Sequence, residues 1–362
     1  MMDELQQKYN QAVAVVERCK SKRGFWASAS YYSGQLWLRD LYYSLSGLKA
    51  LGYLEEAKLQ ILLTLKKVKK NKVPDYVIPR PDGWIALLRP QAWVGLFIDS
   101  PYRPWAADTP LLLLMLIKQL QLEIPSKLIG KLQLVEERIK KLRDPETGLI
   151  RGCDYRDSLL FHLPLLSNQV DLYVVLRLTG RSDEAEEVRE AIEKFYFSEK
   201  LGYYTDVPDG RRFDVMAYIK LVRSGLLGGR DAERMVEHMM MASTPYGLRN
   251  FYPPYTPEEL RESWITCLRE FRVPWRLRLV FAGGVKRNMR GEYQNATVWP
   301  FVHNLAAETL ADLGFEKEAK RLFMKSPGFH ECYDPKTGEP IGSPNQLWSA
   351  ATWISAYQKL YQ

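Results

Sequence analysis

Apolar side chains recur along most of this chain at the three- and four-residue spacing that puts them on one face of a helix. Residues 1–20 show this pattern with acidic residues first, which predicts an amphipathic helix rather than a signal peptide. Strand-like alternation is scarce, although residues 201–205 could form a short hairpin arm. The pattern therefore predicts an all-α fold. The predicted helices cover residues 59–68, 111–122, 128–142, 170–178, 184–197, 215–222, 231–241 and 304–323.

Short turns with a common arrangement join many of these helices. At Gly52, Gly180 and Gly314 a helix ends, a glycine suits a left-handed C-cap, and acidic residues open the next helix. Gly228 marks a looser version, and Pro125 takes the place of the glycine in another turn. The uneven intervals, roughly fifty to ninety residues, exclude a short-period solenoid. They favour successive helical hairpins, and six hairpins of about sixty residues each would fill the 362-residue chain.

Longer connections, rich in Trp, Tyr, Pro and Gly, lie between the short turns. Loops of this length within a compact domain are usually functional. Short turns on one side and long aromatic loops on the other predict a toroid of α-helical hairpins with one functional face. No linker rich in Ser, Gly or Pro divides the chain, so we expect residues 1–362 to form a single domain. The long connections cover residues 25–40, 74–108, 144–158, 202–214, 244–256, 286–300 and 328–348.

Composition and charge argue against several other classes of protein. The net charge of +8 comes from Lys and Arg interleaved with Glu and Asp, which is more typical of solvated helix faces than of a nucleic-acid-binding stripe. The longest apolar run, residues 111–117, is too short to cross a bilayer. The four cysteines are widely separated and form no CxxC pair, so a reducing cytoplasm is the simplest location. We therefore expect neither nucleic acid nor a membrane as a partner.

Two distant segments each place carboxylates among aromatic residues and glycines. In TGLIRGCDYRDSLL, residues 147–160, Asp154 and Asp157 are three apart and would share one face of a helix start. One could cap the helix while the other faces a substrate, and Arg156 would favour the ionised form of either. In FHECYDPKTGEPIGSPNQLWSA, residues 329–350, Glu331 has no Lys or Arg within three residues. Because glycoside hydrolysis needs two carboxylates, these segments predict a carbohydrate-active enzyme.

Other residues suited to sugar hydroxyls lie where helices are expected to begin. Trp37 offers a stacking face, and Arg39 and Asp40 can form paired hydrogen bonds with adjacent hydroxyls. Each of these residues also has a purely structural interpretation, as a helix cap or an ion-pair partner. The candidate substrate-binding residues are Trp37, Arg39, Asp40, Asp108, Tyr155, Arg156, Asp157, Gln169, Glu292, Gln294, Asn295, Trp299, Gln346 and Trp348.

Several motifs, which follow one another along the chain in the same order as in the family, resemble those of the six-hairpin glycosidases, the (α/α)6-barrel enzymes. That group includes amylo-α-1,6-glucosidases, processing α-glucosidases with their mannosylglycerate-hydrolase relatives, neutral invertases and trehalases. The resemblance spans almost the whole chain and implies an inverting hydrolase of a short or terminal α-glucoside. The motifs are WLRD at 37–40, ADTPLL at 107–112, GCDYRD at 152–157, EYQNATVWPF at 292–301, and HECYDPKTGEPIG with NQLWSAA at 330–351.

The resemblance also implies a role for each matching residue. Asp154 would be the general acid, with Asp157 as its competitor for that role, and Glu331 would be the general base. An inverting pair of carboxylates lies about 6.5–9.5 Å apart to leave room for a water molecule. The −1 subsite would be formed by Trp37, Arg39 and Asp40, and the pocket would be lined by Gln294, Asn295 and Trp299.

Two alternatives stay open on the same fold. A sugar epimerase or isomerase would need His162, His303 or His330 to line the pocket, and a non-catalytic scaffold would present a groove without convergent carboxylates. The sequence contains no HExxH, CxxC pair, Walker loop, GxGxxG or GxSxG, so we expect neither a metal nor a cofactor. The expected ligand is a small carbohydrate, and the sequence does not determine the oligomeric state.

Overall fold

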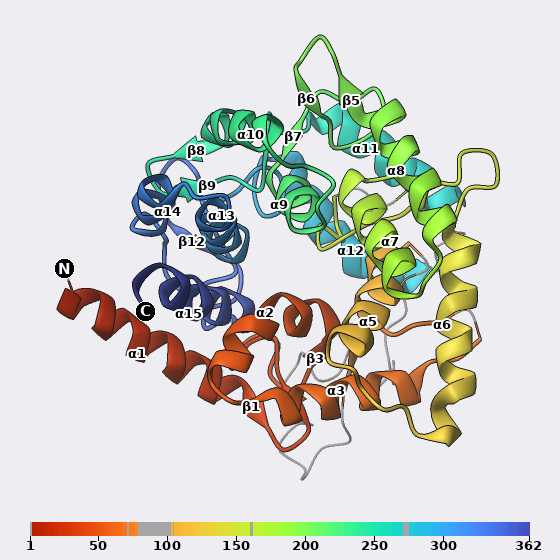
Figure 1. The fold of residues 1–362 in the computed structure, drawn as a ribbon, viewed down its shortest axis with the longest axis horizontal. Coiled ribbons are helices and arrows are strands. Elements are labelled where there is room, and N and C mark those ends of the chain that lie inside the picture. The colour runs from red at the N-terminus through yellow and green to blue at the C-terminus, as the bar shows by residue number, and fades with distance from the viewer. Residues whose placement is uncertain (1, 71, 79–102, 104, 160–161, 271–274) are drawn as a thin grey trace.

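The computed structural model describes residues 2–70, 72–78, 103, 105–159, 162–270 and 275–362 (Figure 1). The long connection predicted at 74–108 therefore lies largely outside the described residues.

Within the described residues, six helices form a closed inner ring in which each helix contacts the next (Figure 1). The last of them, α15, packs against the first, α2, and so closes the ring. The inner helices are α2 (Leu38–Ala50), α5 (Asp108–Gln119), α7 (Leu166–Leu178), α9 (Val215–Arg223), α13 (Pro300–Asp312) and α15 (Leu347–Tyr361).

An outer helix packs against each inner one, which confirms the predicted all-α toroid of helical hairpins (Figure 1). The 3-10 turn η2 (Ser126–Leu128) precedes one of them, and an additional pair, α11 (Pro257–Glu270) and α12 (Trp275–Met289), lies between α10 and α13 along the chain. The outer helices are α1 (Met2–Cys19), α3 (Leu54–Lys67), α6 (Ile129–Leu142), α8 (Ser182–Tyr196), α10 (Arg230–Met241) and α14 (Glu316–Phe323).

The two rings differ in how their side chains are buried. In α13 every residue from Pro300 to Leu310 is buried, because this helix has neighbours on all sides. In the outer helix α14, burial is confined to Ala319, Leu322 and Phe323 on one face. The core therefore lies between the two rings and within the inner ring. Helices that are apolar on all sides suit the inner ring, and amphipathic helices suit the outer ring.

The apolar spacing over 304–323 covers two helices, because Gly314 adopts φ 86° and ends α13 at the turn predicted there. Gly52 and Gly180 adopt similar positive φ values of 79° and 76°, as the turn pattern predicted. The pair α11 and α12 was not predicted, and in α12 the adjacent glycines Gly283 and Gly284 weaken the local helix signal.

Short antiparallel strand pairs connect the helices, and β3 and β7 lead directly into the inner helices α2 and α9. The hairpin arm predicted near residues 201–205 corresponds to β5 paired with β6. The pairs are β1 (Lys20–Ser21) with β2 (Gly24–Phe25), β3 (Leu36–Trp37) with β4 (Tyr76–Val77), β5 (Phe197–Ser198) with β6 (Tyr203–Tyr204), β7 (Phe213–Asp214) with β10 (Phe251–Tyr252), β8 (Ser243–Thr244) with β9 (Gly247–Leu248), and β11 (Cys332–Tyr333) with β12 (Pro340–Ile341).

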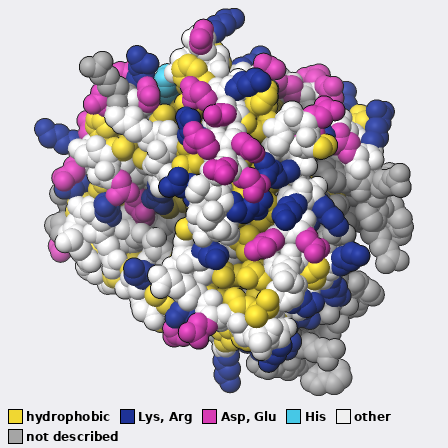
Figure 2. Space-filling model, turned by 45° about the vertical axis from the view of Figure 1, so that its right-hand side comes forward, with side chains coloured by type: hydrophobic (Ala, Val, Ile, Leu, Met, Phe, Trp, Pro, Cys, Tyr) yellow, Lys and Arg dark blue, Asp and Glu magenta, His cyan; other side chains and the backbone are white. Residues whose placement is uncertain are grey.

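The surface carries charges of both signs. On the face drawn in Figure 2, Lys and Arg side chains are interspersed with Asp and Glu rather than gathered into a basic stripe. All four cysteines are buried free thiols. Among the described residues, no helix combines the length and the apolar character needed to span a membrane.

Candidate active site

The inner helices begin beside many of the predicted residues. Since an outer helix returns the chain between successive inner helices, the inner helices run in the same direction and their N-terminal ends share one face of the barrel. Trp37 precedes α2, Asp108 opens α5, Trp299 precedes α13 and Gln346 precedes α15. The helical topology thus brings together residues that are far apart in the sequence.

Glu331 lies directly before β11, in a tightly bonded loop. Its backbone N–H donates to Ser343 O at 2.8 Å, and its carboxylate accepts from Ser343 N at 3.0 Å. The carboxylate also accepts from the hydroxyls of Tyr293 at 2.9 Å and Tyr32 at 3.4 Å. A Cβ at Gly342 would lie 2.4 Å from Glu331 Oε2, so this close approach requires a glycine. Burial raises the pKa of Glu331 above its usual value.

Asp157 is held by cations. Its Oδ2 pairs with Arg39 at 3.2 Å and also with Arg103, while Oδ1 accepts from Gln294 Nε2 at 3.1 Å. The side chain keeps 17% exposure, so it is not sealed within the core. Burial alone would raise its pKa, but Arg103 and Arg39 favour the carboxylate and hold the pKa below its usual value.

Glu331 and Asp157 share one electrostatic environment. Burial raises the pKa of Tyr32 and of Tyr293, and the negative charges of Glu331 and Asp157 raise both further. After burial, the charge of Asp157 also raises the pKa of Glu331. The structure thus brings together two carboxylates, with two tyrosine hydroxyls bonded to one of them.

Neither tyrosine was among the predicted site residues. Tyr32 lies in the predicted loop 25–40, and Tyr293 lies within the motif at 292–301. The sequence therefore placed both in candidate segments, but tyrosines are frequent in this chain and nothing local separated these two from the rest.

Asp154, the predicted general acid, does not fit that role in this structure. Its side chain is fully buried and accepts from Arg156 Nη2 at 2.6 Å and from Ser167 Oγ at 2.6 Å. Arg156, a predicted substrate-binding residue, is itself fully buried and also pairs with Asp214 at 2.7 Å. Although burial opposes the shift, Arg156 lowers the pKa of Asp154 to about 2. Because the Asp154 carboxylate is sealed in the core, it has no access to a substrate in this structure.

The two arginines that bind Asp157 are each held by a further aspartate. Arg39 binds Asp108 with two parallel hydrogen bonds of 2.6 and 2.7 Å, a fork geometry that fixes its remaining nitrogen toward Asp157. Arg103 similarly binds Asp75 at 2.6 Å. Arg39 and Asp108 were predicted, whereas Arg103 and Asp75 lie in the long connection 74–108, where no periodic pattern singles out individual residues.

Three further predicted residues lie on the same face. Gln346 Nε2 donates to Asp40 Oδ1 at 3.1 Å, and burial together with the charge of Glu331 raises the pKa of Asp40. Trp37 is half-buried and stacks on Tyr76 with ring centroids 4.4 Å apart. A partly accessible indole suits the face of a sugar ring.

Other predicted residues are buried or are bonded to neighbouring side chains. Tyr155, Trp299 and Trp348 belong to the buried aromatic core, where Trp348 stacks on Phe301 at 4.3 Å. Gln294 orients Asp157 rather than standing free.

The last three predicted residues also make contacts away from Glu331 and Asp157. Gln169 bonds the backbone of Ile150, Asn295 bonds the backbone of Tyr255, and the partly exposed Glu292 pairs with Arg290. None of these three contacts points to a substrate.

Histidines do not gather into a common site. His303 is buried between backbone groups of Leu248 and Leu322, and burial lowers its pKa to about 3. His162 lies near Ser263 and His330 beside Tyr333. Within the described part of the chain, no group of three His, Cys, Asp or Glu side chains could hold a metal ion. The arrangement therefore offers nothing that favours a histidine-based epimerase.

Comparison with known families places the chain among glycoside hydrolases. The model of the mannosylglycerate hydrolase MGH1-like glycoside hydrolase domain matches residues 144–349, more than half of the 362 residues. The chain belongs to this glycoside hydrolase family. The matched segment contains Asp157 and Glu331 together, so both lie inside the family's domain.

Relatives of this glycoside hydrolase share its fold more clearly than its sequence. A mannosylglycerate hydrolase of Thermus thermophilus is 40% identical over 67 residues, which are 17% of this chain and only 16% of that protein. A crystal structure of a GH63 mannosylglycerate hydrolase from Thermus thermophilus in complex with glucose superposes with a TM-score of 0.63 at 17% identity, covering 96% of this chain and 99% of the other.

A second solved structure, a wild-type glycosidase, superposes with a TM-score of 0.64 at 11% identity over 98% of this chain and 96% of its own. At such low identities these matches show the fold alone, and they agree with the helical toroid.

Proposed function

We propose that this glycoside hydrolase cleaves a short or terminal α-glucoside with inversion of configuration, with Asp157 as general acid and Glu331 as general base. The observation that supports the proposal is the shared environment of these two carboxylates on the N-terminal face of the barrel. Residues 1–362 would form one catalytic domain around this site.

The assignment of acid and base follows the motifs that carry the resemblance. The acid belongs to the GCDYRD segment, in which Asp154 is sealed and Asp157 is accessible. The base belongs to the HECYDP segment, where Glu331 accepts hydrogen bonds that hold its carboxylate in place. In an inverting reaction Asp157 protonates the leaving oxygen, while Glu331 takes a proton from the water that attacks the anomeric carbon from the opposite face.

In the free protein, the favoured protonation states of the two carboxyls are the reverse of those that the reaction needs. Burial favours protonated Glu331, while Arg103 and Arg39 favour ionised Asp157. When the pair holds one proton, that proton therefore lies mostly on Glu331. The active form, in which Asp157 is protonated and Glu331 is ionised, is the less populated of the two. Because both carboxyls are ionised at high pH, we expect the greatest rate on the acid side of neutrality. The apparent pKa values read from the two sides of the pH–rate profile describe the coupled pair rather than either residue alone.

A short substrate is supported by the relatives. Structures of the Thermus thermophilus GH63 hydrolase contain glucose in one case and Tris with D-glycerate in another. Glucosylglycerate is therefore the first compound to test, with mannosylglycerate as the competitor that differs in the glycone. Maltose, isomaltose, trehalose, sucrose and panose complete the panel, and proton NMR of the first product anomer reports the stereochemistry. Release of the α-anomer from an α-glucoside would contradict inversion.

Two variants separate the acid from the base. Asp157→Asn should lower hydrolysis of the preferred glucoside by about 10²- to 10⁴-fold, yet still act on α-glucosyl fluoride, because fluoride leaves without protonation. Glu331→Gln should lose activity on both substrates, since no base activates the water. Glu339→Gln, on the exposed part of the same loop, is the matched control and should keep full activity. Fluoride hydrolysis by Glu331→Gln, with none by Asp157→Asn, would reverse the assignment.

A further inference from the structure

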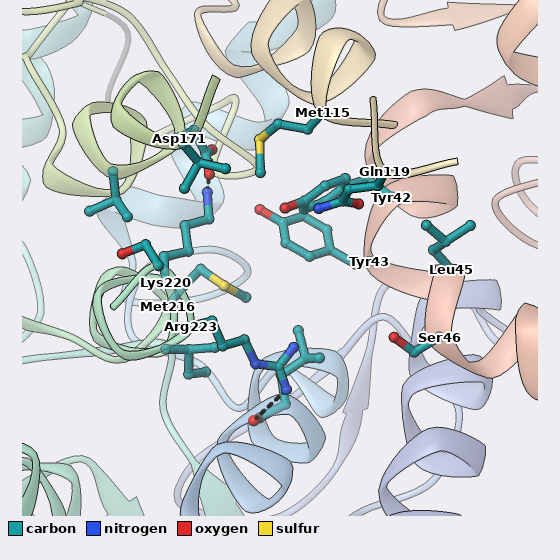
Figure 3. Close-up of a pocket in the computed structure, with 15 residues that line it drawn as sticks. Tyr42, Tyr43, Leu45, Ser46, Met115, Gln119, Asp171, Met216, Lys220 and Arg223 are labelled. Atoms are coloured by element: carbon teal, nitrogen blue, oxygen red, sulfur yellow. Dashed lines mark hydrogen bonds and ion pairs between the residues drawn. The ribbon is translucent and has the colours of Figure 1, made fainter. Parts of the chain in front are cut away.

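A polar cavity lies inside the barrel, between the inner helices (Figure 3). It has a volume of about 210 Å³ and is lined by side chains from α2, α5, α7, α9 and α13. Its polar lining includes Tyr42, Tyr43, Gln119, Asp171, Lys220 and Arg223.

The outer part of this cavity is displaced from the candidate active site. Ser46, an exposed lining residue, lies seven residues beyond Arg39 on α2, a distance of about 10 Å along the helix axis, whereas the buried lining residue Tyr43 lies about one turn beyond Arg39. Tyr43 packs against Phe301 with ring centroids 4.9 Å apart, and Phe301 in turn stacks on Trp348. Tyr43, at the inner wall of the cavity, therefore belongs to a row of packed aromatic side chains that continues to Trp348 at the start of α15.

Charges at the cavity are balanced by their neighbours. Lys220 pairs with Asp171 at 2.5 Å, and both are almost fully buried. Arg223 pairs with Glu308 at 2.8 Å and also bonds Thr309. Because each cation already has an anionic partner, the cavity has no excess charge with which to select an ion. It favours a neutral ligand.

One hydroxyl group in the cavity wall needs a partner. Tyr43 is buried, and its hydroxyl has no hydrogen-bond partner within the described part of the chain. In Figure 3 this hydroxyl points away from α2, toward the space beside Lys220 and below Met115. A buried hydroxyl left without a partner is unfavourable by about 1–3 kcal/mol, so a ligand hydroxyl placed here would gain a hydrogen bond and relieve that penalty.

The cavity can be reached from solvent. Ser46, Gln119 and Arg223 line it and are all exposed residues, so its mouth lies beside Ser46 of α2 and the last residues of α5 and α9. The cavity volume of about 210 Å³ is many times the roughly 10–15 Å³ that a single water molecule needs on a comparable measure. The cavity therefore has room for a molecule considerably larger than one water.

We propose that this cavity binds a neutral polyhydroxylated molecule of monosaccharide size, at a second site distinct from the catalytic one. Tyrosine rings supply apolar faces, while Tyr43, Gln119 and the ion pair supply donors and acceptors for several hydroxyls. The inference rests on the cavity itself and does not depend on which glycoside the enzyme hydrolyses.

Glucose binding measured by isothermal titration calorimetry tests the proposal. All proteins carry Trp37→Ala, which weakens glucose binding at the candidate active site. Adding Ser46→Trp places a large side chain across the cavity mouth from an exposed position, and Lys49→Trp is the matched control on the same helix, exposed but outside the cavity lining. Thermal unfolding should show equal stability of the two tryptophan variants, so that lost binding reflects the blocked mouth.

We expect Ser46→Trp to remove one equivalent of bound glucose and Lys49→Trp to remove none. Inorganic phosphate, titrated in parallel, should not compete with that equivalent. Unchanged glucose binding in the Ser46→Trp protein would overturn the proposal, as would phosphate binding that depends on Ser46 without glucose binding. None of these outcomes requires hydrolysis, so failure here is distinguishable from failure of the proposed reaction.

Discussion

The hydroxyl of Tyr293 donates a 2.9 Å hydrogen bond to Oε1 of Glu331, deep in the N-terminal face of the barrel. This bond stabilises the ionised form of a carboxylate whose burial otherwise favours protonation. The ionisation of the proposed general base therefore depends on a residue 38 positions earlier in the chain.

Replacing that hydroxyl should make Glu331 a weaker acid. We expect Tyr293→Phe to raise the pKa of Glu331 further, because a hydrogen bond to its charged form is lost while its burial remains. Tyr32→Phe should raise the pKa less, since the Tyr32 contact is longer, at 3.4 Å. Titration of carboxyl ¹³C shifts, assigned with the Glu331→Gln protein, measures both changes. An equal or larger effect of Tyr32→Phe would contradict the ranking.

Arg103 should control the other carboxylate. It pairs with Asp75 and Asp157 through different nitrogens of one guanidinium, and the compact ammonium of lysine cannot reach both. We therefore expect Arg103→Lys to raise the pKa of Asp157, read by the same ¹³C titration. Arg151→Lys, in an exposed pair with Glu270, is the control and should leave Asp157 unchanged.

Asp154 should matter for stability. Asp154→Asn leaves the buried Arg156 with Asp214 as its remaining carboxylate partner and should lower the free energy of unfolding by about 3 kcal/mol, measured by urea titration near neutral pH. Asp183→Asn, on the exposed first turn of α8, should change it by less than about 0.5 kcal/mol.

The advantage of the wild type over Asp154→Asn should also depend on pH. Its Asp154 has a pKa of about 2, below the value of about 3.9 in an unfolded chain. A lowered pKa stabilises the fold above the unfolded value, and that contribution disappears as the pH falls toward 2. The two proteins should therefore converge in stability at low pH, and a constant difference would argue against a charged Asp154.

Helix contact in the inner ring should be sensitive to one added methyl group. A Cβ at Gly47 on α2 would lie 2.0 Å from the carbonyl oxygen of Ala351 on α15, so the backbones would have to separate. We expect Gly47→Ala to destabilise the protein by about 2 kcal/mol. Gly130→Ala, on the exposed side of α6 with open space around it, should instead stabilise it by about 0.5 kcal/mol. Thermal unfolding of both variants measures the contrast.

The sequence by itself determined the helical hairpins and the segments that carry chemistry. Apolar periodicity and turn glycines such as Gly52 and Gly180 act locally, so they predict helices and their ends without knowledge of the fold. The motif around Glu331 is equally local, because its turn and aromatic neighbours are adjacent in the chain.

Only the tertiary structure decided between the two aspartates. Asp154 and Asp157 stand three residues apart in equivalent surroundings, but Arg156 meets Asp214, which lies far along the chain, and seals Asp154 in the core. Arg39 and Arg103 come from two other segments and hold Asp157 where its carboxylate stays partly exposed. Burial and ion pairing depend on which distant residues meet, and these contacts exist only once the ring has closed.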